Sequence, residues 1–327
     1  MQRRQLLQNA IALAGAAAAT PAAFAQPGYP SQQPIRWIVP YPAGGGTDVL
    51  ARTMAEALRV PLGQQIVVDN RPGASTNIGA QLVATAKPDG YTLMSADNAL
   101  LAFNEHLFSK LPFSPEKDFS YVGGLSRFPL ALVVNPAFEA RNFAQFLAYA
   151  RANPGKLNYA SPGNGSPHHL AMEMFKNRTK TFLTHIPYRG AAPALQDVMG
   201  GQVPCMFLDL AAGLPVIQSG KVRVLAIGSS RRAASLPDVP TLAEVGVADA
   251  EVYAFQGVLG PAGLPSAIVG QLNAEINKAL ATPAVAQRLQ GFGMEALPGT
   301  PEQFRAMARA EAKRWGPIIQ AAGIKLD

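Results

Sequence analysis

IRWIVPYPAGGGTDVLAR (residues 35–52) joins an apolar run to a helix-like segment through a proline and three consecutive glycines. The apolar run at 35–40 is typical of a strand that is buried on both faces of a sheet. Apolar residues then recur every four positions, which predicts a helix over 47–59. Glycines at a helix start let another molecule approach main-chain N–H groups that have no partner within the helix. The stretch therefore predicts a strand–turn–helix unit with room for a ligand at the turn.

The same alternation of strand-like and helix-like segments continues along the chain, and it predicts an α/β fold of parallel sheets flanked by helices. Strands are expected at 35–40, 65–70, 91–96, 131–135, 157–161, 184–188, 203–209, 222–228 and 254–261. Helices are expected at 47–59, near 76–86, at 143–152, 167–177 and 191–199, before Gly220, and as two long C-terminal helices, the second covering 302–321.

Two sheets account for this pattern better than one. The helices after Pro265 follow only the strand at 254–261, so they must pack back onto a lobe that has already formed. The first lobe is the natural place, which makes the chain cross between lobes at least twice. We expect lobe 1 to comprise residues 34–130 and 255–327, and lobe 2 to comprise residues 131–254.

Residues 1–25 carry the pattern of a cleaved export signal. Arg3 and Arg4 precede an apolar run that ends at Ala23-Phe24-Ala25, which matches an A-x-A cleavage site. The paired arginines also resemble a twin-arginine signal, with an ordinary secretory signal as the alternative. The apolar run is too short to span a membrane well, and no cysteine follows the cleavage site as a lipoprotein would need. Both signals predict export to a bacterial periplasm.

The composition narrows the class of partner. The chain has 327 residues, of which 48% are hydrophobic, and a formal net charge of +7. Removal of the signal leaves 26 basic and 21 acidic residues, or +5. No dense basic cluster is present, so nucleic acid is not the expected partner. Four histidines and one cysteine make a metal site improbable, and Cys205 lies in a strand-like run where a core residue is expected.

Four turns that follow predicted strands are rich in small and polar residues: PAGGGTD (42–48), NRPGASTNIGA (70–80), SPGNGSPHHL (161–170) and YRGAAPAL (188–195). Ligands of open α/β sheets bind beyond the carboxyl ends of the strands, and helix starts at such turns attract anions. A single loop of this kind is usually only a turn. Four of them, two in each lobe, favour a ligand held between the lobes.

The turns do not match nucleotide-binding or catalytic motifs. The glycines at 44–46 are followed by neither the Lys of a P-loop nor the third glycine of a dinucleotide fingerprint, since Val49 stands in its place. A carboxylate needs no such motif. GNGSP places Ser166 one position late for a nucleophile elbow, and the order Ser166, His168, Asp209 is wrong for an α/β-hydrolase. An exported serine hydrolase of small esters or amides, using Ser161 or Ser166, stays open as an alternative.

Five segments together resemble the Bug family, the extracytoplasmic solute receptors of tripartite tricarboxylate transporters. They are IRWIVPYPAGGGTDVLAR, VVDNRPGASTNIGAQLVATAKPDGYTLM, LNYASPGNGSPHHLAMEMF, IPYRGAAPALQDVMGGQV and RVLAIGSSRRAASLPDVPTLAEVG. The resemblance covers essentially the whole chain after the signal. It implies a two-lobed periplasmic binding protein of the type II-like, Venus-flytrap kind, in which each lobe is a mostly parallel sheet flanked by helices. It also implies a monomer without catalysis or cofactor that serves membrane transporter subunits; a receptor that presents its ligand to a signalling partner is the alternative.

The resemblance further implies where a small carboxylate is held. The loops Pro42–Asp48 and Pro72–Gly79 would take the carboxylate, partly through bridging waters. The loops Ser161–His168 and Tyr188–Ala192, with Asp209, would supply most of the other contacts. The candidate ligand-binding residues are Tyr41, Pro42, Ala43, Gly44, Gly45, Thr47, Asp48, Gly73, Ser75, Thr76, Asn77, Asp97, Ser161, Gly163, Asn164, Ser166, His168, Tyr188, Gly190, Ala191 and Asp209.

The chain departs from the family pattern at 95–98 and at Asn104-Glu105. Asp97 and Asp209 would repel a second ligand carboxylate if they face the cleft, and they could instead accept hydrogen bonds from an amino, amide or hydroxyl group. Alternatively, Asp97 caps the helix that follows it. An amino acid, a hydroxy acid and an aromatic acid therefore all stay open as ligands.

Overall fold

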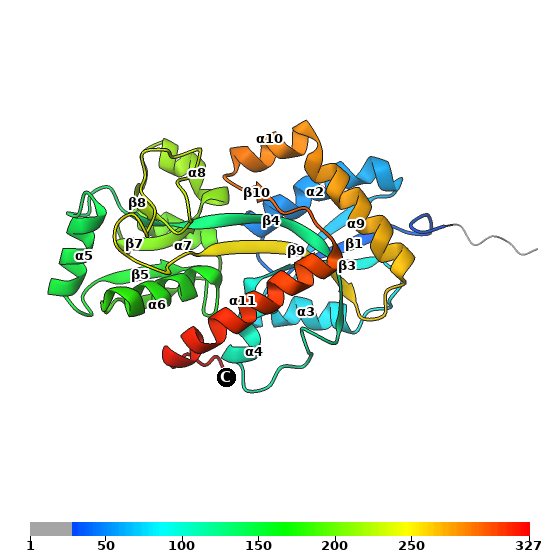
Figure 1. The fold of residues 1–327 in the computed structure, drawn as a ribbon, viewed down its shortest axis with the longest axis horizontal. Coiled ribbons are helices and arrows are strands. Elements are labelled where there is room, and N and C mark those ends of the chain that lie inside the picture. Colours follow the sequence, from blue (N-terminus) through cyan, green and yellow to red (C-terminus); the bar gives the residue numbers. More distant parts are fainter. Residues whose placement is uncertain (1–27) are drawn as a thin grey trace, which may run out of the picture.

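Two long neighbouring strands cross the molecule and connect its two lobes (Figure 1). They are β4 (Phe119–Val134) and β9 (Tyr253–Pro261), which pair antiparallel. The computed structural model describes residues 28–327, so the export signal predicted at 1–25 lies outside the described residues. The expected lobe boundaries, at 130/131 and 254/255, fall within the two crossing strands.

In lobe 1, β1 (Ile35–Val39) pairs parallel with β2 (Ile66–Asn70) and β3 (Thr92–Asp97), and β3 continues antiparallel to β9. The helical segments are α2 (Gly46–Leu62), η1 (Ala74–Thr76), α3 (Asn77–Ala84), η2 (Ala99–Phe103) and α4 (Asn104–Leu107). The chain returns to this lobe as α9 (Ser266–Ala281), α10 (Pro283–Gly291), β10 (Glu295–Ala296) and α11 (Pro301–Ala321). As predicted, the C-terminal helices pack on the first lobe, where α9 lies against α2 and α11 against η2.

Lobe 2 repeats the parallel arrangement. β5 (Asn158–Ser161) pairs parallel with β6 (Thr184–Pro187) and β7 (Cys205–Asp209), while β7 and β8 (Arg223–Ile227) pair antiparallel with β4. The helices are α5 (Phe143–Ala152), α6 (Pro167–Thr179), α7 (Ala191–Met199) and α8 (Leu210–Gln218). Cys205 is buried, and burial raises the pKa of its thiol, so it is the core residue that the sequence predicts.

Three details of the predicted fold are wrong. The strands do not form two separate sheets, because β4 joins them into one path, β2-β1-β3-β9-β4-β7-β5-β6. β4 begins at 119 and not at 131. The sequence pattern missed its first part because the glycines at 123–124 interrupt the apolar run, and these glycines accompany register shifts against β9. Three helices follow Pro265 instead of two, since Thr282 caps α10 as a separate helix with Pro283 in its first turn.

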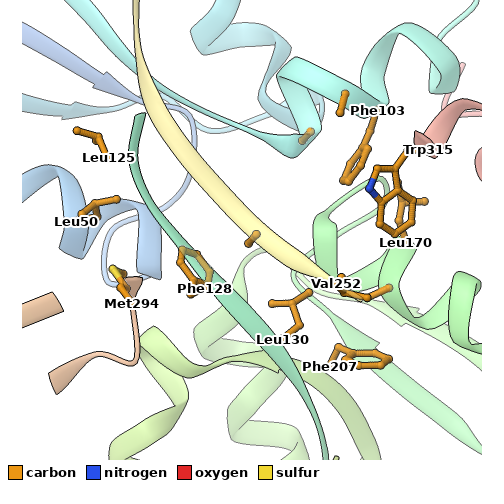
Figure 2. Packing of buried hydrophobic residues seen from close by; sticks show 14 of the residues in the cluster. Leu50, Phe103, Leu125, Phe128, Leu130, Leu170, Phe207, Val252, Met294 and Trp315 are labelled. Atoms are coloured by element: carbon orange, nitrogen blue, oxygen red, sulfur yellow. The ribbon is translucent and has the colours of Figure 1, made fainter. Parts of the chain in front are cut away.

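The hydrophobic core continues from one lobe to the other along β4. Figure 2 follows it from Leu50 and Met294, near Phe128, to Val252 and Phe207, near Leu130. At the other side of the cluster, Phe103 of η2 packs edge to face on Trp315 of α11, with ring centroids 5.1 Å apart. The crossing strands are therefore packed into the core of both lobes, and they position the residues at the base of the cleft.

Candidate ligand-binding cleft

Two adjoining cavities lie between the lobes. The cavity that reaches Asp97 and Gln256, here called the inner cavity, has a volume of about 110 Å³. The outer cavity, which reaches Thr76 and Asn164, has a volume of about 480 Å³. Both are lined by residues of the two lobes, and they share Tyr41, Pro42, Pro162, Ser166, Arg189 and Gly190.

Three helices begin at the inner cavity. Gly45, Gly46 and Thr47 line it at the start of α2, Ser166, Pro167 and His168 at the start of α6, and Gly190, Ala191 and Ala192 at the start of α7. The first N–H groups of a helix have no partner within the helix, and its dipole is positive at this end. One helix comes from lobe 1 and two from lobe 2, so an anion between the lobes meets positive ends from both sides.

Asp48 fixes the backbone of the loop at 42–48 without lining either cavity. Its carboxylate accepts hydrogen bonds from the Gly44 N–H, the Arg52 guanidinium and the Asn70 amide, each at 3.0 Å. Burial opposes its ionisation, but these hydrogen bonds prevail and hold the pKa of Asp48 below its usual value. Asp48 is therefore a positioning residue for the glycine turn.

The second loop has an unusual backbone. Ala74, Ser75 and Thr76 adopt positive φ angles of 45°, 49° and 79°, which non-glycine residues keep only when their surroundings hold them. Asn104 supplies that restraint, since its amide donates to the Ser75 carbonyl and to Asn77 Oδ1, both at 2.7 Å.

The two lobes touch at the rim of the cleft. The Ser75 hydroxyl in lobe 1 donates to the Asn164 carbonyl in lobe 2 at 2.9 Å. Gly190, at φ +118°, lies so close to Pro42 that a Cβ atom there would be 3.5 Å from the proline ring. Ser75 and Asn164 line the outer cavity, and Pro42 and Gly190 line both cavities, so the lobes approach each other beside the two cavities.

Asp97 lines the inner cavity and also binds groups of its own lobe. Its Oδ1 accepts the Ala99 N–H at 3.1 Å, at the start of η2, and its Oδ2 accepts the Tyr41 hydroxyl at 2.7 Å. Burial raises the pKa of Asp97, although the hydrogen bonds that it accepts from Tyr41 and the backbone lower it. Burial and the Asp97 charge raise the pKa of the Tyr41 hydroxyl well above its usual value.

His168 and Gln256 bring partly unpaired side chains to the inner cavity. His168 Nε2 lies 3.3 Å from Asp209 Oδ2, and Gln256 Nε2 donates to the Thr47 hydroxyl at 2.7 Å. Within residues 28–327, neither His168 Nδ1 nor Gln256 Oε1 has a hydrogen-bond partner. Sequence reasoning missed Gln256; the signal was a lone amide within the otherwise apolar strand AFQGVLGP.

Most of the predicted residues gather at the two cavities. Those that line the inner cavity are Tyr41, Pro42, Ala43, Gly45, Thr47, Asp97, Ser166, His168, Gly190, Ala191 and Asp209. The outer cavity adds Gly73, Ser75, Thr76, Gly163 and Asn164. Neither cavity is lined by Gly44, Asp48, Asn77, Ser161 or Tyr188. The inner cavity also includes Phe128, Ala254 and Gln256, which lie outside the four predicted turns.

The two serines proposed for hydrolysis are both engaged in hydrogen bonds within lobe 2. Ser161 Oγ lies 2.6 Å from His185 Nε2, but the serine is fully buried and lines neither cavity. Ser166 caps α6, because its hydroxyl accepts the His169 N–H and donates to the Gly163 carbonyl. In residues 28–327, no cluster of three or more His, Cys, Asp or Glu side chains could hold a metal ion.

A stack of two imidazoles lies behind the 161–166 loop. The rings of His169 and His185 are parallel with centroids 4.0 Å apart. Burial, with the Lys176 charge, lowers the pKa of His169 to about 4, and burial, with His169 itself, lowers the pKa of His185 to about 3. Both rings are therefore neutral in the folded protein over a range in which an unfolded histidine, with a pKa near 6.5, takes up a proton.

This stack predicts acid sensitivity. Between about pH 6.5 and pH 4 the unfolded chain binds more protons than the folded one, so stability falls as the pH falls. We expect His169→Gln to make the free energy of unfolding less dependent on pH in that range, as measured by urea unfolding at several pH values. His106→Gln, outside the stack, is the matched control. An unchanged slope in His169→Gln would contradict this account.

The comparisons with known proteins agree with this architecture. Residues 50–324 match the family described as "Tripartite tricarboxylate transporter family receptor". Protein BugT of Bordetella pertussis is 38% identical over 299 residues, which cover 91% of this chain and 91% of BugT.

Two solved structures extend the likeness to the fold. One is an R. palustris protein with adipate, at a TM-score of 0.88 and 34% identity over 91% of this chain and 99% of the other. The second is MatC from Rhodopseudomonas palustris with bound malate, at a TM-score of 0.82 and 33% identity over 88% of this chain and 99% of the other. The fold is thus the two-lobed one that the sequence predicts. The chain belongs to the tripartite tricarboxylate transporter receptor family, which confirms the predicted likeness to the Bug receptors.

Proposed function

We propose that this protein is a periplasmic solute-binding receptor that captures a small carboxylate between its lobes and delivers it to a tripartite tricarboxylate-type membrane transporter. The observation that carries the proposal is the convergence of three helix starts, from both lobes, on one cavity between the lobes. The adipate and malate bound in two similar structures support a carboxylate as the ligand. We propose no catalytic role for the cleft, since its two candidate serines are a buried residue and a helix cap.

The mechanism follows from the two crossing strands. In the open form the glycine turn of lobe 1 presents the N–H groups at the start of α2 to a carboxylate. Bending of β4 and β9 then brings the starts of α6 and α7 onto the same carboxylate and excludes water. A hydrogen bond to an anion strengthens as the local dielectric falls, so closure and binding reinforce each other. A membrane partner can then distinguish the loaded form by its shape.

The proposed location is the periplasm, with the signal at 1–25 removed. No helix within residues 28–327 combines the length and apolar character of a membrane crossing. The proposed receptor acts as a monomer without cofactor. A signalling partner in place of a transporter is the alternative, and the presence of transporter subunit genes beside this one would argue against it.

Thermal unfolding of the mature protein with a panel of small carboxylates tests the proposal. At least one acid is expected to raise the melting temperature in proportion to the logarithm of its concentration, as mass action requires. Mass spectrometry of ligand released from freshly purified protein would identify the natural acid. Stabilisation by neutral sugars alone would contradict the proposal. Steady ester or amide hydrolysis that is lost in Ser166→Ala would favour the hydrolase instead.

A further inference from the structure

The inner cavity combines groups that attract opposite kinds of ligand atom. The helix starts at Gly45, Ser166 and Gly190 present N–H donors, whereas Asp97 presents a carboxylate that can only accept while it is ionised. The cavity volume is about 110 Å³, against roughly 10–15 Å³ for one water molecule. It therefore has room for a group of several non-hydrogen atoms, so a ligand anion and its hydrogen-bond donor can both lie in it.

Two hydrogen bonds to Asp97 favour its ionised form and oppose the effect of burial, which raises its pKa. The Tyr41 hydroxyl and the Ala99 N–H both donate to its carboxylate, and Asp97 is only 4% exposed. A second ligand carboxylate in this space would face a like charge at low dielectric, which is unfavourable. A hydroxyl or ammonium group would instead donate to Asp97.

Two further polar atoms, on side chains that line the inner cavity, have no hydrogen-bond partner in residues 28–327. His168 is 7% exposed and Gln256 is 2% exposed, and within the described residues His168 Nδ1 and Gln256 Oε1 have no partner. A buried polar atom without a partner is costly, and native proteins rarely tolerate it. Both residues line the inner cavity, so its wall holds hydrogen-bonding capacity that the described part of the protein does not use.

We propose that the inner cavity selects acids that carry a hydroxyl or ammonium group on the carbon next to the carboxylate. Asp97, positioned by Tyr41, is the residue that accepts the hydrogen bond from this group. The remainder of the ligand extends past Tyr41 and Gly190 into the outer cavity. This inference rests on the proposed receptor function and adds the ligand class that the receptor takes.

Matched acids test this class by isothermal titration calorimetry. An aliphatic series consists of butyrate, 2-hydroxybutyrate, 2-aminobutyrate and succinate, and an aromatic series of phenylacetate, mandelate and phenylglycine. In the series that fits the outer cavity, the hydroxy or amino acid is expected to bind at least about tenfold tighter than its unsubstituted parent, as one hydrogen bond to a charged group provides. The hydroxy and amino members distinguish the two donors.

Asp97→Asn tests the residue. The preference for the substituted acid over its parent is expected to shrink at least about threefold, because an amide is a weaker acceptor than a carboxylate. Because the readout is a ratio of two affinities in one variant, a general loss of folding cannot produce it. Asp69→Asn is the matched control, since Asp69 pairs with Arg36 and Arg71 outside both cavities.

The outcomes separate this inference from the proposed function. Equal binding of substituted and unsubstituted acids, or tightest binding of succinate, overturns the inference and leaves a carboxylate receptor in place. An unchanged preference in Asp97→Asn overturns the role of Asp97. Failure of every acid in both series and in the wider carboxylate panel overturns the receptor function, and the inference with it.

Discussion

Gly45→Val is expected to weaken carboxylate binding at least about tenfold while leaving the stability of the fold nearly unchanged. Gly45 precedes α2 with φ −83° and ψ 169°, a conformation that valine adopts readily. A Cβ atom there would meet only the Pro42 carbonyl, 4.0 Å away. The new methyl groups would stand beside the first N–H groups of α2, at an inner cavity of only about 110 Å³. They would therefore displace the ligand and not strain the protein.

Calorimetric titration with the tightest acid of the panel, together with thermal unfolding, measures both parts of this prediction. Gly45→Ala should give an intermediate loss of affinity, because it adds one carbon to the same space. Gly270→Val, on α9 and with open space around its Cβ position, controls for the added side chain. Unchanged affinity in Gly45→Val would remove the first glycine loop from the site.

Trp315→Ala is expected to have the largest effect on stability, a loss of about 3–5 kcal/mol in the free energy of unfolding. Trp315 is 1% exposed in α11 and packs edge to face on Phe103 of η2, the segment that follows Asp97. Removal of the indole leaves a cavity between α11 and η2. Lobe 1 would thus lose the contact that ties its last helix to the site.

Urea unfolding monitored by circular dichroism tests this second prediction. Trp315→Phe, which keeps a ring in the same place, should lose clearly less stability. Phe182→Ala, at a side chain that is 59% exposed, should lose less than about 1 kcal/mol. A loss of less than 1 kcal/mol in Trp315→Ala would show that α11 is not an integral part of lobe 1.

The four loops were predictable because they depend on local rules. Apolar periodicity marks each strand and helix, and the carboxyl ends of parallel strands meet at one edge of a sheet. Knowledge of the strand order was therefore not needed to bring the 42–48 and 161–170 loops to one cleft. The resemblance to a known family added Asp209, which has no such local signature.

The remainder of the site depends on tertiary structure. Phe128 and Gln256 line the inner cavity because β4 and β9 pass beneath it, and no local pattern of residues encodes that crossing. Ser161 lies at the end of β5, where the strand pleat turns its side chain toward His185 and away from the cleft. The Tyr188 hydroxyl is likewise taken by Asp197, at 2.6 Å. Which loop residues face inward is set by backbone geometry that composition does not reveal.

The central claim is that the cleft binds the carboxylate group itself. Calorimetric titration of the mature protein with an acid and its matched carboxamide, such as 2-hydroxybutyrate and 2-hydroxybutyramide, tests it most directly. The pair differs only in the group that meets the starts of α2, α6 and α7. The acid that binds tightest in the panel is expected to lose at least about a hundredfold in affinity as its amide, since hydrogen bonds to a charged group are roughly twice as strong as neutral ones. Equal affinity for acid and amide would contradict the account.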